Sequence, residues 1–139
     1  MITDEEKKEI IDKAKFDFKE LQKFIEENPG FAKSEASKGI FSLGVLVQLV
    51  FALQYAKIKS TPFESKLKGL HLTPKDVNRI FIEAVEKVNQ HAFQTTYQDL
   101  RKYIAEQIHI HRTEIEKMSN QEISFNFVCG LELGRKFKS

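Results

Sequence analysis

Fifteen consecutive residues, Phe41 to Tyr55 with the sequence FSLGVLVQLVFALQY, are apolar on almost every face of a helix. A helix without a polar face must be covered by other elements on all sides. At 1.5 Å per residue this helix would be about 22 Å long, too short for the hydrocarbon core of a bilayer. Ser42, Gln48 and Gln54 also interrupt the run. We therefore expect a buried central helix in a helical bundle.

Glycines and flanking residues support a helix over a strand in this run. Gly39 and Gly44 would let neighbouring helices approach closely. The flanks lack the turn residues of a hairpin, and an apolar strand of this length would be unusual.

The first predicted helix covers about 24 residues. It begins at Thr3, which forms a capping box with Glu6, and it ends at Asn28-Pro29-Gly30. One apolar stripe runs along it at spacings of three and four residues. The stripe consists of Ile10, Ile11, Ala14, Phe18, Leu21, Phe24 and Ile25.

Cap and breaker residues divide the rest of the chain into further helices. The predicted segments are 35–57, a short helix over 62–67, a helix that begins after Thr73, one from Thr95 or Thr96 to Lys117, and one that begins after Ser119. The expected inward residues of the last two helices are Leu100, Tyr103, Ile104, Ile108 and Ile115, then Ile123, Phe127, Val128 and Leu131. The sequence thus predicts an all-α fold, with residues 1–139 as one domain. We expect a compact bundle of five main helices plus one short helix around the buried central helix.

Few residues suggest catalysis or metal binding. The single cysteine, Cys129, lies in an apolar run with no basic neighbour to lower its pKa. His109 and His111 would point in different directions on a helix, and Glu106-x-x-His109 has no second pair to complete a di-iron site. No Gly-rich phosphate loop is present. We expect no enzyme activity, metal, cofactor or small-molecule substrate.

The N-terminus and the cysteine content indicate the compartment. The first ten residues, MITDEEKKEI, are charged and polar, unlike a secretory signal, and a lone cysteine cannot form an intramolecular disulfide. We expect a cytoplasmic protein that does not contact a membrane.

Positive charge is concentrated in one part of the chain. Residues 1–27 carry a net charge of −3 and residues 28–139 a net charge of +5. Residues 57–79 include six basic and two acidic residues, a net charge of +4. Such a local basic surface can hold a polyanion, although an ordinary solvated surface is the alternative. The first candidates are Lys57, Lys59, Lys66, Lys68, Lys75 and Arg79, the second are Arg135, Lys136 and Lys138, and Lys33 and Lys38 follow.

Three segments in this order resemble one protein family. They are FSLGVLVQLVFALQ (41–54), STPFESKLKGLHLTPKDVNRIFIEAVEKVN (60–89) and SNQEISFNFVCGLELGRKF (119–137). Together they are similar to the C-terminal domain of the large subunit of type I-B CRISPR effector complexes (Cascade), a region that also resembles the separately made small subunit. The family's long N-terminal region, which recognises the motif flanking the target, has no counterpart here. The chain thus looks like the free-standing small subunit, which in this family implies production from an internal start.

The resemblance implies a non-catalytic role. Small subunits line the belly of the complex in several copies, contact the backbone and large subunits, and help to hold the unwound target DNA beside the guide RNA. Base pairing supplies specificity, so sequence-independent phosphate contacts would suffice. The alternative is a helical protein–protein interaction module with no nucleic-acid role, which the mixed-charge first helix would suit.

Overall fold

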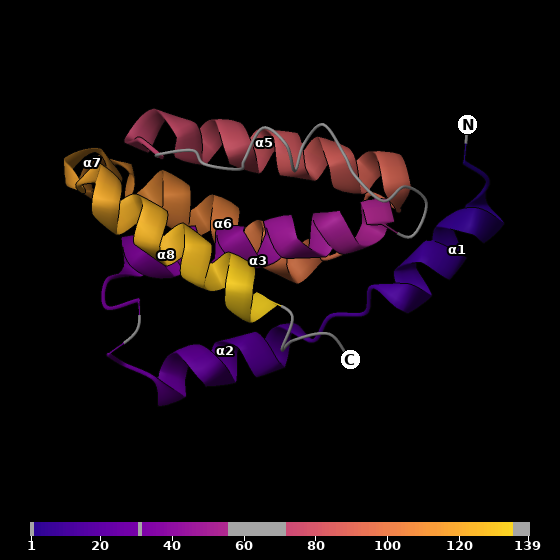
Figure 1. Ribbon diagram of the computed structural model, residues 1–139, viewed down its shortest axis with the longest axis horizontal. Coiled ribbons are helices and arrows are strands. Elements are labelled where there is room, and N and C mark those ends of the chain that lie inside the picture. Colours follow the sequence, from indigo (N-terminus) through magenta and orange to yellow (C-terminus); the bar gives the residue numbers. More distant parts are fainter. Residues whose placement is uncertain (1, 31, 56–71, 135–139) are drawn as a thin grey trace.

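The computed structural model describes residues 2–30, 32–55 and 72–134, and within them the chain forms seven helices and no strand. The helices are α1 (Asp4–Lys13), α2 (Phe18–Glu27), α3 (Glu35–Tyr55), α5 (Pro74–His91), α6 (Gln98–Ile110), α7 (Arg112–Lys117) and α8 (Asn120–Leu133). The predicted all-α fold around a central helix is confirmed (Figure 1). The short helix expected over 62–67 lies outside the described residues.

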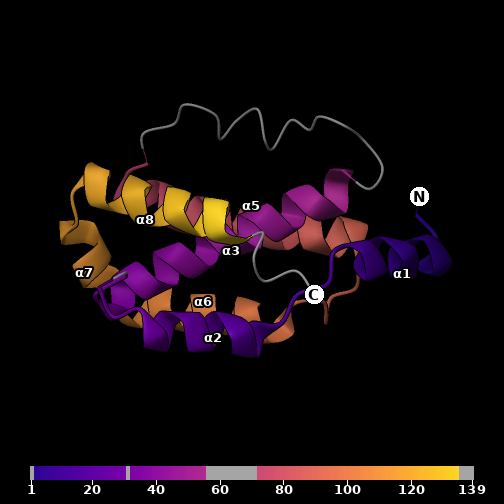
Figure 2. The same cartoon turned by 60° about the horizontal axis from the view of Figure 1, so that its bottom comes forward.

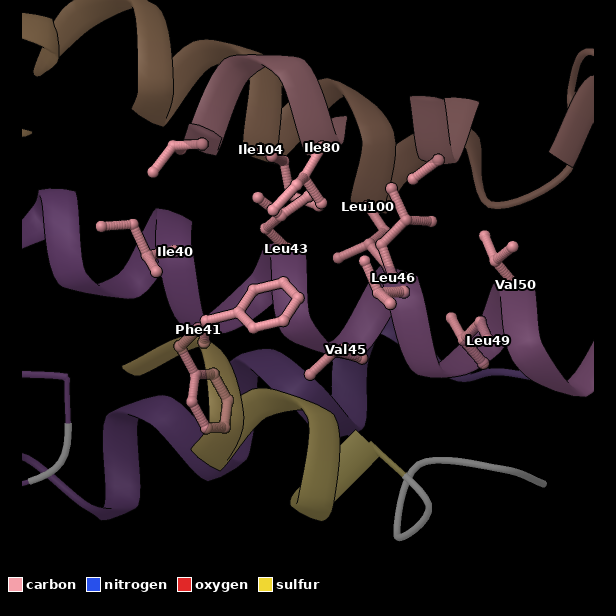
Figure 3. Packing of buried hydrophobic residues seen from close by; sticks show 14 of the residues in the cluster. Ile40, Phe41, Leu43, Val45, Leu46, Leu49, Val50, Ile80, Leu100 and Ile104 are labelled. Carbon is pink, nitrogen blue, oxygen red and sulfur yellow. The ribbon is translucent and has the colours of Figure 1, made fainter. Parts of the chain in front are cut away.

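Helix α3 is the centre of the core. Every residue from Gly39 to Phe51 is buried, and α8 packs on one side of α3 while α5 and α6 pack on another (Figures 1 and 2). In Figure 3, Ile80 of α5 and Leu100 of α6 point toward the apolar side chains of α3. By length and composition alone α3 could cross a membrane, but 89% of its apolar window is buried by the protein itself, as in the core helix of a bundle.

Two glycines let α3 and α8 cross with their backbones in contact. A Cβ atom added to Gly44 would collide with the carbonyl oxygen of Phe127, and one added to Gly130 would collide with the carbonyl oxygen of Phe41. The two backbones are therefore in direct contact, an approach that only residues without side chains permit. Gly39 has a similar role toward α6, since its Cβ would lie 2.8 Å from the Cβ of Gln107.

The three capped helix starts read from the sequence are confirmed. The Thr3 hydroxyl accepts a hydrogen bond from the Glu6 backbone N–H at 3.1 Å, and Ser119 does the same for Glu122 at 3.1 Å. At the start of α5, the Thr73 N–H donates to the carboxylate of Asp76 at 2.8 Å. These contacts satisfy backbone donors that have no partner within the helix.

The prediction of one long first helix was wrong, because the chain breaks between α1 and α2. Asp17 caps α2 by accepting from the Lys19 N–H at 2.9 Å. The carbonyl of Ala14, which is fully buried, accepts a hydrogen bond from the Tyr97 hydroxyl. The ring of Phe16 meets Tyr97 edge-on, with 5.9 Å between ring centroids. The break lets α1 and α2 cover different parts of the bundle (Figure 1).

The helix predicted over 95–117 also differs, since it is two helices. Its cap is not a threonine: Tyr97 takes the left-handed conformation (φ 57°) before α6. The Thr96 hydroxyl instead accepts from the Phe93 N–H at 3.0 Å and closes the preceding turn. The chain breaks again at His111, the residue between α6 and α7. Tyr103, expected to face inward, is half-buried and lies against Phe18 with 5.8 Å between ring centroids.

The predicted inner face of α8 was partly wrong. Ile123 and Phe127 are buried as expected, whereas Val128 is 49% exposed. Gly130 sets the rotation of this helix because it has to face α3. That rotation brings Asn126 inward, where its side-chain amide donates to the Glu122 carbonyl at 2.8 Å.

Replacing Gly130 with alanine should destabilise the protein strongly. The added methyl group meets the backbone of α3, so the helices would have to separate, and we expect a loss of about 3 kcal/mol in the free energy of unfolding. Gly30→Ala is the matched control, because a Cβ at Gly30 meets nothing within 4 Å. Urea denaturation of both variants measures the difference, and equal stability of the two would contradict the close crossing.

Stability should also depend on His91, at the end of α5. Burial and the charge of the neighbouring Lys87 hold the pKa of His91 below its ordinary value of 6.5, and its Nδ1 atom is buried without a hydrogen-bond partner in the described part of the chain. On lowering the pH, His91 therefore takes up its proton in the unfolded chain before it does so in the folded chain. The contribution of neutral His91 to the free energy of unfolding is fully present above about pH 7, and it is lost as the pH drops through 6.5 toward the lower pKa of the folded state.

The variant His91→Gln should show a weaker pH dependence than the native protein in urea titrations between about pH 7 and pH 5. His109→Gln serves as the control, since His109 is exposed. A slope that stays unchanged in His91→Gln would show that another group causes the acid destabilisation.

Candidate nucleic-acid interface

The first and second groups of candidates together contain nine basic residues. The structure describes two of them, and both lie on α5. Lys75 and Arg79 are one turn apart and exposed, and their positions are fixed because Thr73 caps α5 and Pro74 occupies its first turn. The other seven lie outside the described residues: Lys57, Lys59, Lys66, Lys68, Arg135, Lys136 and Lys138.

Arg79 is partly neutralised by a neighbour. Its guanidinium lies 2.5 Å from a carboxylate oxygen of Asp76, and the arginine side chain is 61% exposed. The backbone hydrogen bond from Thr73, followed by the contacts with Arg79, lowers the pKa of Asp76, while partial burial opposes this shift. Asp76 is therefore a carboxylate that serves both the helix cap and the ion pair.

Lys75 has a different environment. It is exposed and makes no ion pair within the residues that the structure describes. Its ammonium group is thus the more available cation of this pair for an external phosphate. A lysine on the first turn of a helix can reach a phosphate without reading a base.

Lys75 lies on the rim of a groove between α5, α6 and α7. The groove has a volume of about 810 Å³. Its floor is apolar and includes Val77, Phe81, Ile108 and Ile115, while its rim carries Lys75, Asn78, His109, Arg112 and Glu116. Arg112 and Glu116 face each other at 3.7 Å. The rim therefore carries one cation more than it has anions.

Arg112 is a candidate that the sequence did not reveal. It stands far from Lys75 in the chain, and the two join one groove only because α7 packs against α5. No spacing rule connects positions on different helices, and the local charge around Arg112 is mixed.

The remaining predicted cations are separate from this groove. Lys33 is exposed just before α3, and Lys38 pairs with Glu35 at 2.8 Å on its first turns. Neither lines the groove of Lys75.

A second hollow, of about 1070 Å³, lies between α2 and α6. Its charged lining residues are Asp17, Lys19, Asp99, Lys102 and Glu106, so acids outnumber bases. This hollow is consequently less suited to a polyanion than the groove of α5, α6 and α7. Glu106 and His109, which share a helix turn, line different hollows.

The single cysteine does not have the character of a reactive thiol. Burial raises the pKa of the Cys129 thiol, the direction opposite to that of a reactive thiolate. Within residues 2–30, 32–55 and 72–134, no three His, Cys, Asp or Glu side chains are grouped as metal ligands would be.

Comparison with known proteins gives one match, and it spans the chain. Residues 1–139 match the family described as CRISPR-associated protein TM1802 (cas_TM1802), C-terminal domain. Comparisons with curated proteins and with solved structures gave no match. Membership in this family connects the chain to CRISPR systems and points to other CRISPR components as its partners. The chain belongs to the C-terminal domain family of the CRISPR-associated protein TM1802.

Proposed function

We propose that this chain is the non-catalytic small subunit of a type I-B CRISPR–Cas surveillance complex in the cytoplasm. Several copies would assemble along the backbone subunits, next to the large subunit, and hold the unwound target DNA beside the guide RNA. The observation that carries the proposal is the match of all 139 residues to a CRISPR-associated domain family.

The proposed mechanism needs only a rigid body with exposed cations. Guide–target base pairing selects the sequence, so the protein has to contact phosphates alone. Lys75 and Arg79 stand on a helix that is anchored to the core by Val77, Ile80, Ala84 and Val88. A strand passing several copies would gain a few contacts from each, and the summed contacts would retain it.

The two described cations should contribute unequally. Lys75→Ala should weaken binding of a single-stranded oligonucleotide and reduce the slope of log affinity against log salt by about 0.7, the value of one phosphate contact on a single strand. Arg79→Ala should have a smaller effect, because Arg79 has to share its charge with Asp76. Fluorescence anisotropy across a salt series on assembled complexes measures both.

Lys102→Ala is the matched control, since Lys102 is an exposed lysine that lines the other hollow. Asp76→Asn should shift affinity in the opposite direction to Lys75→Ala, because it releases Arg79 from its ion pair. Equal slopes of log affinity against log salt for Lys75→Ala and Lys102→Ala would show that Lys75 does not contact the strand. Unchanged DNA loading after charge reversal of Lys57, Lys59, Lys66, Lys68, Lys75 and Arg79 together would overturn the whole assignment.

A second candidate function is a protein-interaction module that does not touch nucleic acid. The apolar floor of the groove between α5, α6 and α7 favours it, because apolar grooves commonly accept side chains of a partner. Salt dependence separates the two functions. Phosphate contacts give a steep linear fall of log affinity with log salt, whereas an apolar groove contact would change little.

A further inference from the structure

The groove of α5, α6 and α7 has an aromatic ring in its floor. Phe81 is half-buried and lines the groove. Within the part of the chain that the structure describes, its ring pairs neither with another aromatic ring nor with a cation. The part of the ring that borders the groove can therefore take a planar partner from outside.

Helix α5 places a cation, an amide and this ring in order around its surface. At 100° per residue, Asn78 lies about 60° from Lys75, and Phe81 lies about 60° further in the same direction. Val77 follows about 40° beyond Phe81, and it is buried. Around the helix, the side chains thus pass from an exposed cation, through an exposed amide, to the ring at the groove floor.

The other helices of the groove leave room for a ligand. Ala105 of α6 is exposed and lines the groove with only a methyl group. Ile108 and Ile115 are buried and close the floor. The volume of about 810 Å³ lies within the range of small-ligand pockets, about 300–1,000 Å³. A flat heterocycle the size of a nucleobase can therefore enter.

These groups match the three parts of a nucleotide. A nucleobase has a π-face that stacks on aromatic rings, an edge of hydrogen-bond donors and acceptors, and a phosphate attached through its sugar. Phe81 suits the face, Asn78 the edge and Lys75 the phosphate. The side-chain amide of Asn78 makes no hydrogen bond within the described residues. An apolar side chain of a protein partner would use the floor and leave the amide and the ammonium group without a contact.

From this arrangement we propose that the groove takes one unpaired base of the held strand. The base stacks on Phe81 with its edge toward Asn78, while Lys75 contacts the adjoining phosphate. The inference deepens the proposed function and rests on it for the class of ligand, single-stranded nucleic acid. Stacking tolerates every base, so the groove holds the strand without selecting its sequence. A base that lies in the groove cannot pair with the complementary strand, so each copy also helps to keep the duplex open.

Two single strands with the same phosphates separate base contacts from phosphate contacts. One is an oligothymidylate of about 12 nucleotides, a length typical of single-strand sites. The other has the same length and consists of abasic units. Fluorescence anisotropy with the full chain at up to about 1 mM, the weak end of specific association, measures both affinities. The native chain should bind the oligothymidylate about 5- to 150-fold more tightly, the effect of stacking one base. The slope of log affinity against log salt should be the same for both strands, because the number of phosphate contacts is the same.

Two variants of the full chain test the groove. Phe81→Leu removes the ring and keeps an apolar side chain, so the preference for the oligothymidylate should disappear while the salt slope stays native. Ala105→Leu keeps the ring and fills the groove from an exposed position, and it should abolish the preference as well. Phe18→Leu is the matched control, since Phe18 is also half-buried but lines the other hollow. Circular dichroism checks that each variant is folded.

Equal affinity of the native chain for the two strands would overturn the base site and leave a function based on phosphate contacts intact. A preference that persists in both groove variants, or that Phe18→Leu loses equally, would overturn the base site too. A chain that binds neither strand alone, yet enters the CRISPR complex in several copies, would refute the base site only. A preference that both groove variants lose, in a chain that does not enter the complex, would support the base site and refute the proposed function.

Discussion

The contact of the α3 and α8 backbones through Gly44 and Gly130 is the constraint on which the rest of the structure depends. Because α3 is apolar on almost every face, it needs cover on every side, and α8 makes the most extensive contacts with it. The crossing also fixes the rotation of α8. With Gly130 turned inward, Phe125 and Val128 are turned outward, so one packing requirement creates both the core and an exposed apolar face.

Local signals in the sequence predicted local structure well. The caps at Thr3, Thr73 and Ser119 were found because a capping box lies within four residues of chain. The break before α2 was missed, although Asp17 is a local cap residue there. The second contact at the break, a hydrogen bond from the Tyr97 hydroxyl to the carbonyl of Ala14, joins residues 83 positions apart and has no local signal. The inner face of α8 was partly misassigned, with Val128 placed inward, because apolar residues occur on several sides of that helix and their spacing leaves its rotation open.

The candidate interface likewise combines features that the sequence predicts with features that only the packing of the helices creates. Lys75 and Arg79 were found from the local excess of positive charge, but the ion pair that occupies Arg79 and the groove that adds Arg112 appear only when the helices are packed. Charge counted along a sequence gives the number of cations. The packed structure decides which of them are available to a phosphate, and here Lys75 is more available than Arg79.

A helical bundle with exposed cations is compatible with the proposed role of holding a strand without reading its sequence. Membership in the CRISPR-associated family connects the chain to CRISPR systems. The most direct test is the subunit composition of a type I-B complex. The chain would be produced together with the other subunits and a guide RNA, and the purified assembly weighed by native mass spectrometry. The account predicts several copies per complex and tighter target-DNA binding than in a complex prepared without the chain. Absence of the chain from the purified complex would contradict it.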